Sequence, residues 1–161
     1  MHRFISWTAV IAWMLVIFSL SAQVAEESNR LSTDVTEAVV RTVEKVKPDA
    51  EINVIRLNQI IRKNAHFLCY LVLGILAMNA FRRNGCSIGK SLILSFFLCA
   101  VYAVSDEIHQ LYVPGRGAQV ADVLIDCTGG VTGMFIYWFA GKTFNLIRTG
   151  KKTMFQVQAN D

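Results

Sequence analysis

Residues 91–110 read SLILSFFLCAVYAVSDEIHQ, an apolar run that ends in a cluster of ionisable side chains. The 15 residues from Ser91 to Ser105 cover about 22 Å as an α-helix, which is less than the roughly 30 Å hydrocarbon core of a bilayer. If this segment spans a membrane, the cluster therefore lies in the outer part of the bilayer. Ionisable side chains there are costly toward lipid, so we expect them to face the protein interior or a wet cavity.

The composition indicates a membrane protein. Apolar residues make up 53% of the 161-residue chain and charged residues 17%, against roughly 45–50% and 25% in an ordinary soluble domain. The length predicts one domain, residues 1–161. The net charge of +4 does not indicate nucleic-acid binding, because no basic stripe is interleaved with aromatic residues. Nucleophile-elbow, P-loop and dinucleotide-binding motifs are absent from the sequence.

Three more apolar runs accompany the first, at about 4–22, 65–81 and 122–141. A bilayer is spanned by about 20 such residues. The run at 4–22 is long for the core of a signal peptide and offers poor cleavage sites, so we expect a retained helix. The sequence therefore predicts an all-α bundle of four transmembrane helices.

The distribution of basic residues predicts the orientation of this bundle. The N-terminal flank, the loop between the runs at 65–81 and 91–110, and the tail 142–161 together contain one acid, Asp161, and eight lysines and arginines, which are Arg3, Arg82, Arg83, Lys90, Lys142, Arg148, Lys151 and Lys152. Short cytoplasmic segments are enriched in such residues. We therefore expect both termini in the cytoplasm and residues 23–64 outside it.

Residues 23–64 are polar and carry seven acidic and seven basic side chains. Asp34 followed by Glu37 resembles a capping box, and Pro48 ends the run of valines that follows. Asp49 can begin a second helix that continues into the span at 65–81. We interpret 31–61 as two amphipathic helices on or near the membrane surface, with a solvated loop as the alternative.

On this topology three spans bring polar side chains to the same outer end of the bundle. The candidates for catalysis are His66, Asp106, Glu107, His109 and Gln110. The candidates for binding are Arg62, Lys63, Arg116, Asp122 and Asp126. Buried carboxylates beside histidines suit general acid–base chemistry or a metal-bound water.

A divalent cation is one interpretation of these residues. Asp106 and His109 are three apart on a helix, a spacing that metal ligands use in helical bundles. His66 and Asp126 could complete such a site. The spacing does not establish that four ligands converge, so no metal is assigned from the sequence.

The basic residues at this end also have two interpretations. Arg116 could hold a phosphate or carboxylate beside a helix N-terminus, or it could neutralise the acids of the third span in a buried network. In that network Asp122 would cap the fourth helix. Arg62 and Lys63 could contact lipid head groups, although single basic flanks are more often interfacial anchors.

Small residues on the fourth span indicate close helix packing. Gly129 and Gly133 form a Gly-x-x-x-Gly pattern, which favours packing within the bundle and leaves homo-oligomerisation open. Tyr70, one turn after His66, could orient the imidazole or belong to an aromatic belt. The four cysteines have neither disulfide-framework nor metal-site spacing.

Two stretches resemble the VanZ-like family of small integral membrane proteins. Residues 62–67, RKNAHF, with Tyr70 are similar to one element of that family. Residues 105–110, SDEIHQ, are similar to a second element, which continues through Pro114-Gly115-Arg116, Asp122-Val123, Asp126, Gly129 and Gly133. The resemblance covers nearly the whole chain and implies a multi-pass protein of the bacterial plasma membrane. The founding member is associated with low-level teicoplanin resistance, which implies a role in the cell envelope.

Two functions follow as hypotheses. In the first, the protein binds or shields membrane lipids or a lipid-linked cell-wall component, and so alters susceptibility to teicoplanin-type lipoglycopeptides. In the second, it is an enzyme with an intramembrane site, metal-assisted or metal-free, that acts on a lipid-linked or head-group substrate. The sequence alone does not decide whether the protein is an enzyme.

Overall fold

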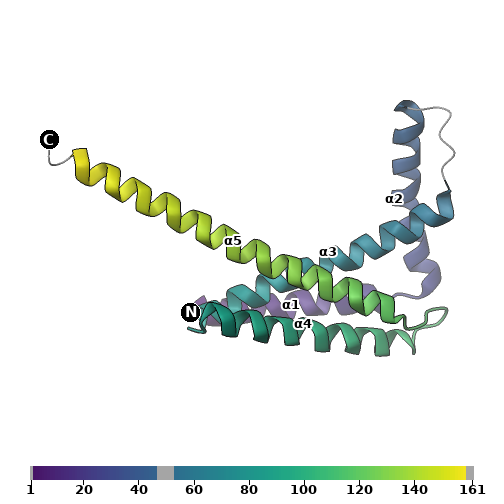
Figure 1. Cartoon of the computed structure of the whole chain (residues 1–161). Coiled ribbons are helices and arrows are strands. Elements are labelled where there is room, and N and C mark those ends of the chain that lie inside the picture. Colours follow the sequence, from purple (N-terminus) through teal and green to yellow (C-terminus); the bar gives the residue numbers. More distant parts are fainter. Residues whose placement is uncertain (1, 47–52, 159–161) are drawn as a thin grey trace.

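All regular secondary structure among the residues that the computed structural model describes is α-helical (Figure 1). These are 2–46 and 53–158 for the backbone, and 3–24, 30, 32–42, 45 and 53–142 for the side chains. The helices are α1 (His2–Ser21), α2 (Ala25–Val46), α3 (Val54–Arg83), α4 (Ile88–Gln110) and α5 (Val120–Gln158).

Four of these helices are long and apolar enough to cross a membrane: α1, α3, α4 and the part of α5 up to Lys142. This confirms the prediction of four apolar helices. The bounds of α1 and α4 agree with the predicted spans to within three residues. In contrast, α3 and α5 are longer than their spans, because residues 54–64 join α3 without a break and α5 continues to Gln158.

The start of α2 differs from the prediction. Helix α2 begins at Ala25, so Asp34 is an exposed residue inside the helix and caps nothing. Glu37 instead pairs with Arg41 one turn later, at 3.3 Å between Oε2 and Nη2. Position 49, the predicted start of the next helix, lies outside the described residues. Helix α3 is capped by Asn53, whose Oδ1 accepts a hydrogen bond from the backbone N–H of Arg56 at 3.0 Å.

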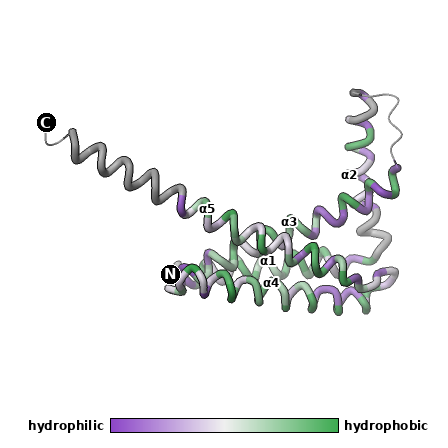
Figure 2. The backbone as a smooth tube through the Cα atoms, in the orientation of Figure 1, coloured by the Kyte–Doolittle hydropathy of each residue, from purple (hydrophilic) through white to green (hydrophobic). Residues whose placement is uncertain are grey.

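The four long helices lie side by side, and α2 stands across one end of them (Figure 1). At this end α1 and α4 finish while α3 and α5 begin. The hydropathy colours show apolar helix middles and polar residues on α2 and the first turns of α3 (Figure 2). We call this end, with the 111–119 segment between α4 and α5, the polar end.

The outer surface of the bundle is apolar. Large side chains point away from the protein on every long helix, among them Leu15, Leu68, Phe97, Val101 and Leu124. A soluble monomer rarely exposes contiguous apolar surface on this scale. The chain is therefore a membrane protein, and this surface faces lipid.

Two polar aromatic side chains of the spans form hydrogen bonds between helices inside the bundle. The indole N–H of Trp13 on α1 donates a hydrogen bond to the carbonyl oxygen of Cys69 on α3, at 2.8 Å. The hydroxyl of Tyr102 on α4 donates to the carbonyl oxygen of Met14. Because water is absent from the bilayer core, such bonds fix how α1 sits against α3 and α4. All four cysteines are free thiols.

The closest helix pair is α3 and α5, which pack more extensively than any other two helices of the described chain. Gly129 faces the backbone of Phe67, and Gly133 faces the backbone of Leu71. A Cβ atom at either glycine would overlap the facing carbonyl oxygen. The Gly-x-x-x-Gly pattern is therefore used within the bundle, where missing side chains let two backbones touch.

Replacing Gly133 by alanine should destabilise the bundle. The added methyl group has no room beside the Leu71 carbonyl, so α3 and α5 must move apart. We expect a loss of about 1–3 kcal/mol or more, measured as a lower melting temperature in mild detergent. Gly141→Ala on the same helix is the control, because a Cβ atom there meets nothing within 4 Å. Equal melting temperatures for the two variants would contradict the close α3–α5 contact.

Candidate functional site

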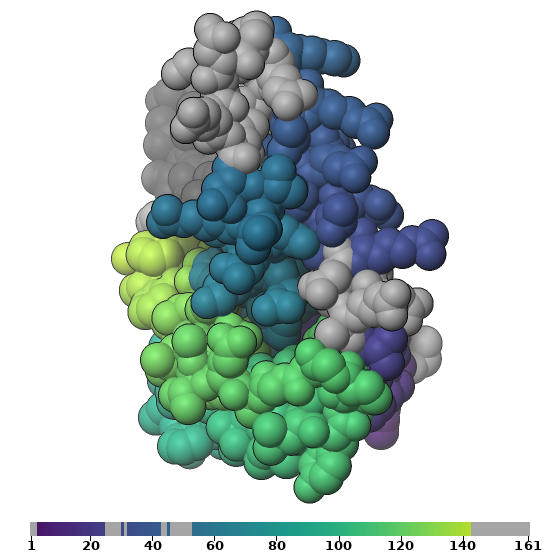
Figure 3. Space-filling model, turned by 90° about the vertical axis from the view of Figure 1, so that its right-hand side faces the viewer, coloured from purple at the N-terminus to yellow at the C-terminus, as the bar shows by residue number. Residues whose placement is uncertain are grey.

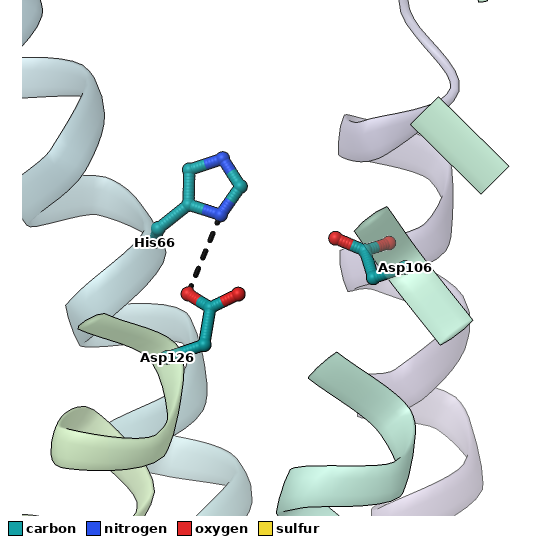
Figure 4. A group of neighbouring side chains, drawn as sticks. All are labelled: His66, Asp106 and Asp126. Carbon is teal, nitrogen blue, oxygen red and sulfur yellow. Dashed lines mark ion pairs between the residues drawn. The ribbon is translucent and has the colours of Figure 1, made fainter. Parts of the chain in front are cut away.

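The centre of the polar end is a cluster of one histidine and two carboxylates from three different helices (Figure 4). His66 comes from α3, Asp126 from α5 and Asp106 from α4. Nδ1 of His66 lies 3.4 Å from Oδ1 of Asp126. One potential ligand atom from each of the three residues lies within 4.8 Å of the other two. We call these three residues the His66 cluster.

The glycine contact between α3 and α5 explains how this cluster forms. Gly129 packs on the backbone of Phe67, the residue that follows His66. Asp126 lies three residues before Gly129, one helical turn along α5, and so faces His66 across the contact. Asp106 approaches from the opposite side on the last turns of α4, as Figure 4 shows.

The carboxylates of the cluster are buried and incompletely hydrogen-bonded. Asp126 is 0% exposed and Asp106 is 3% exposed. Neither oxygen of Asp126 has a hydrogen-bond partner among the described residues, and neither does Oδ1 of Asp106. The other oxygen of Asp106 accepts a long bond of 3.5 Å from Nε2 of Gln110. Buried polar atoms normally have partners, so these oxygens are available for a ligand.

Gln110 and Glu107 hold the polar end together. Nε2 of Gln110 donates to the hydroxyl of Ser21 at 3.0 Å and so joins the ends of α4 and α1. Oε2 of Glu107 accepts a hydrogen bond of 2.7 Å from the backbone N–H of Gln119. Glu107 therefore fixes the 111–119 segment onto the end of α4.

Arg62 and Arg116 lie beside the His66 cluster without a carboxylate partner. Within the described residues, neither guanidinium forms an ion pair, although Arg116 was a candidate to neutralise the acids of α4. Nε of Arg116 is buried and has no hydrogen-bond partner there. Burial lowers the pKa of Arg116, and the nearby charge of Arg62 lowers it further, while the carboxylates of Asp106 and Glu107 act in the opposite direction from a longer distance than an ion pair.

Two cavities meet at these residues. The larger has a volume of about 240 Å³, and its lining is mostly apolar side chains of α1, α2 and α3, such as Ile17, Leu20 and Val35. The smaller has a volume of about 100 Å³ and a polar lining that includes Gln110, Gln119 and Asp122. Both cavities are lined by Arg62, His66 and Arg116. Figure 3 views this end directly, with the start of α3 above the segment between α4 and α5.

Several predicted site residues lie outside the His66 cluster. His109 is not in it, because its ring packs against Phe18 with 4.4 Å between ring centroids. The predicted pairing of Asp106 with His109 as neighbouring metal ligands is therefore not seen. Asp106 lies near His66 instead. Lys63 lines neither cavity. Asp122 lies inside the first turn of α5 and not at its cap, and its side chain is buried beside the smaller cavity.

The site residues predicted from the sequence include none from α1, from α2 or from the link between them, although all three contribute to this end of the molecule. The larger cavity is partly lined by Ser21 at the end of α1, Gln23 in the link between α1 and α2, and Ser32 of α2. Tyr70 also lines this cavity, but its hydroxyl has no hydrogen-bond partner among the described residues, so it does not orient His66. Asp126, not Tyr70, is the side chain that contacts the imidazole of His66.

The fold and the cluster define a class of protein: a multi-pass helical membrane protein with a buried histidine–carboxylate site at one end of its bundle. The chain belongs to the VanZ/LLP1 family, whose model matches residues 6–141. This confirms the resemblance seen in the sequence. The comparisons with curated proteins and with solved structures give no match.

Removing the carboxyl group of Glu107 should release the 111–119 segment. A hydrogen bond to a charged group contributes about 1.5–3 kcal/mol, so we expect Glu107→Ala to speed amide hydrogen exchange at Gln119 roughly tenfold or more. Glu107→Gln keeps an acceptor oxygen and should exchange much more slowly than Glu107→Ala. Equal exchange in Glu107→Ala and the parent protein would show that this contact does not hold the segment.

Proposed function

We propose that this protein binds an anionic lipid-linked component of the cell envelope, with the anionic group between Arg62 and Arg116. The observation that carries the proposal is the pair of arginines that face the same cavities without a carboxylate partner in the described chain. Two neighbouring guanidinium groups repel each other, and a phosphate between them would remove that repulsion.

The two cavities give the ligand its expected form. An apolar chain suits the larger cavity, whose lining includes Ile17, Leu20 and Val35. A charged head group suits the smaller, polar cavity. The shared border at Arg62, His66 and Arg116 is the place for the junction between chain and head group. A polyprenyl phosphate or a lipid with a phosphorylated head group has this chemistry.

The basic loops and tail support an orientation in which the polar end faces outward from a bacterial plasma membrane, with both termini in the cytoplasm. In this orientation the ligand enters from the outer leaflet. By holding such a component, the protein would shield it from teicoplanin-type lipoglycopeptides and reduce their access to the cell wall.

Arg62→Gln should weaken binding of a polyprenyl monophosphate about 10- to 100-fold, because it removes a charge-assisted contact to the phosphate. The measurement is the Kd of the purified protein in detergent for the labelled lipid, with the unphosphorylated polyprenol as the ligand control. Arg56→Gln is the matched variant, since Arg56 is an exposed arginine of the same helix that lines neither cavity.

Equal affinity of the parent protein for the phosphate and the alcohol would refute the anion-binding role. In cells, the shielding role requires that expression of the parent protein and of Arg56→Gln raises the inhibitory teicoplanin concentration, and that Arg62→Gln does not. An unchanged concentration with the parent protein would limit the proposal to lipid binding.

Catalysis is the second candidate function, and the contact between His66 and Asp126 favours it. A carboxylate 3.4 Å from Nδ1 orients an imidazole for general acid–base work, and His66 lines both cavities beside the proposed head-group position. The reaction would be hydrolysis of a phosphate ester, in which water attacks phosphorus and the lipid alcohol leaves.

If the protein is such a hydrolase, it should release inorganic phosphate from the polyprenyl phosphate. His66→Gln should then lower kcat by about 10²- to 10⁴-fold, a much larger effect than its effect on lipid affinity, because Arg62 and Arg116 remain to hold the phosphate. Phosphate release by the parent protein that is no faster than release by Asp126→Asn would exclude catalysis by this cluster and leave the binding role intact.

A further inference from the structure

We infer that the His66 cluster is a binding site for a divalent transition-metal cation such as Zn²⁺ or Mn²⁺, with His66, Asp106 and Asp126 as its three protein ligands. This inference goes beyond the proposed lipid binding and does not depend on it, because the cluster is present without any lipid.

The geometry of the cluster suits a small cation. Two ligand atoms at 2.0–2.2 Å from a tetrahedral zinc ion lie roughly 3.4 Å apart. His66 Nδ1 and Asp126 Oδ1 are already 3.4 Å apart. The ligand atom of Asp106 lies within 4.8 Å of the other two, so it must move closer to them when a cation is bound. Figure 4 shows the Asp106 carboxylate facing the His66–Asp126 pair from across the site.

The burial of the cluster points to a ligand independently of the spacing. Asp126 is fully buried, and both of its oxygens lack hydrogen bonds within the described residues. Two carboxylates beside one histidine carry a net negative charge even when His66 is protonated. An uncompensated charge in a low-dielectric site is costly, and no lysine or arginine of the described chain forms an ion pair with either carboxylate.

The donor set selects the kind of cation. Mg²⁺ and Ca²⁺ prefer oxygen ligands alone, whereas one imidazole with two carboxylates suits Zn²⁺ or Mn²⁺. Three protein ligands leave a fourth position open, as in catalytic zinc sites, and His66 and Asp106 line the larger cavity. Gln110, bonded to Oδ2 of Asp106, holds that carboxylate from outside the cluster and leaves its Oδ1 free.

The test uses tag-free, chelator-treated protein in neutral detergent, titrated with ZnCl₂ in the absence of added lipid. We expect one zinc per chain by elemental analysis and a higher melting temperature with zinc. Asp126→Asn, Asp106→Asn and His66→Gln should each weaken zinc binding roughly 100-fold or more, because each removes a ligand. His109→Gln is the matched control, a histidine of the same end that lies outside the cluster.

The melting temperatures of the variants without zinc show whether a variant has lost a metal ligand or has failed to fold. Asp126→Asn keeps the size of the side chain and removes one of two buried carboxylates that lie close together. Without zinc this variant should therefore still fold and melt near the temperature of the parent protein, and zinc should no longer shift that temperature. Failure of the parent protein to bind Zn²⁺ or Mn²⁺ at millimolar concentration would overturn the inference and show that protons balance the cluster. Undiminished binding in Asp126→Asn would also overturn it, since the ion would then sit elsewhere. The lipid-binding proposal is tested separately, by the lipid affinity of Arg62→Gln, so a failure of one proposal can be distinguished from a failure of the other.

Discussion

The close contact between α3 and α5 is the constraint on which the site depends. Gly129 and Gly133 bring the two backbones together against Phe67 and Leu71. Only at this separation can His66 and Asp126 meet inside the bundle, 3.4 Å apart. A bilayer offers no water to satisfy a buried carboxylate, so the helices that carry these groups must supply their partners. The same two glycines therefore allow the close packing of α3 and α5 and bring His66 and Asp126 together.

The polar end also combines three chemical environments within a few helical turns. The His66 cluster is acidic, Arg62 and Arg116 are basic and lack carboxylate partners in the described chain, and the larger cavity is apolar. An ordinary structural network would pair the arginines with the acids. This separation is the basis of both proposals made above, an anion held between the two arginines and a cation held by the His66 cluster.

Much of the fold follows from the sequence because apolar runs and basic loops obey simple rules in a bilayer. The runs at 4–22 and 91–110 match α1 and α4 closely. The start of α2 was predicted wrongly, because Asp34 and Glu37 form a capping-box pattern that also occurs inside helices. For the candidate site, the topology predicted that His66, Asp106 and Asp126 come to one end of the bundle, and the structure places them together there. The topology could not show that His66 rather than His109 meets Asp106, since helix rotation depends on packing at Gly129 and Gly133.

The contact between His66 and Asp126 can be measured directly by solid-state NMR of the protein in lipid bilayers. The sequence contains three histidines, so ¹⁵N-histidine labelling with ¹³C-labelled aspartate side chains gives few signals to assign. The account predicts a measurable dipolar coupling between a ring nitrogen of His66 and the carboxyl carbon of Asp126, consistent with 3.4 Å between Nδ1 and Oδ1. A His66 ring without coupling to any aspartate carboxyl would contradict it.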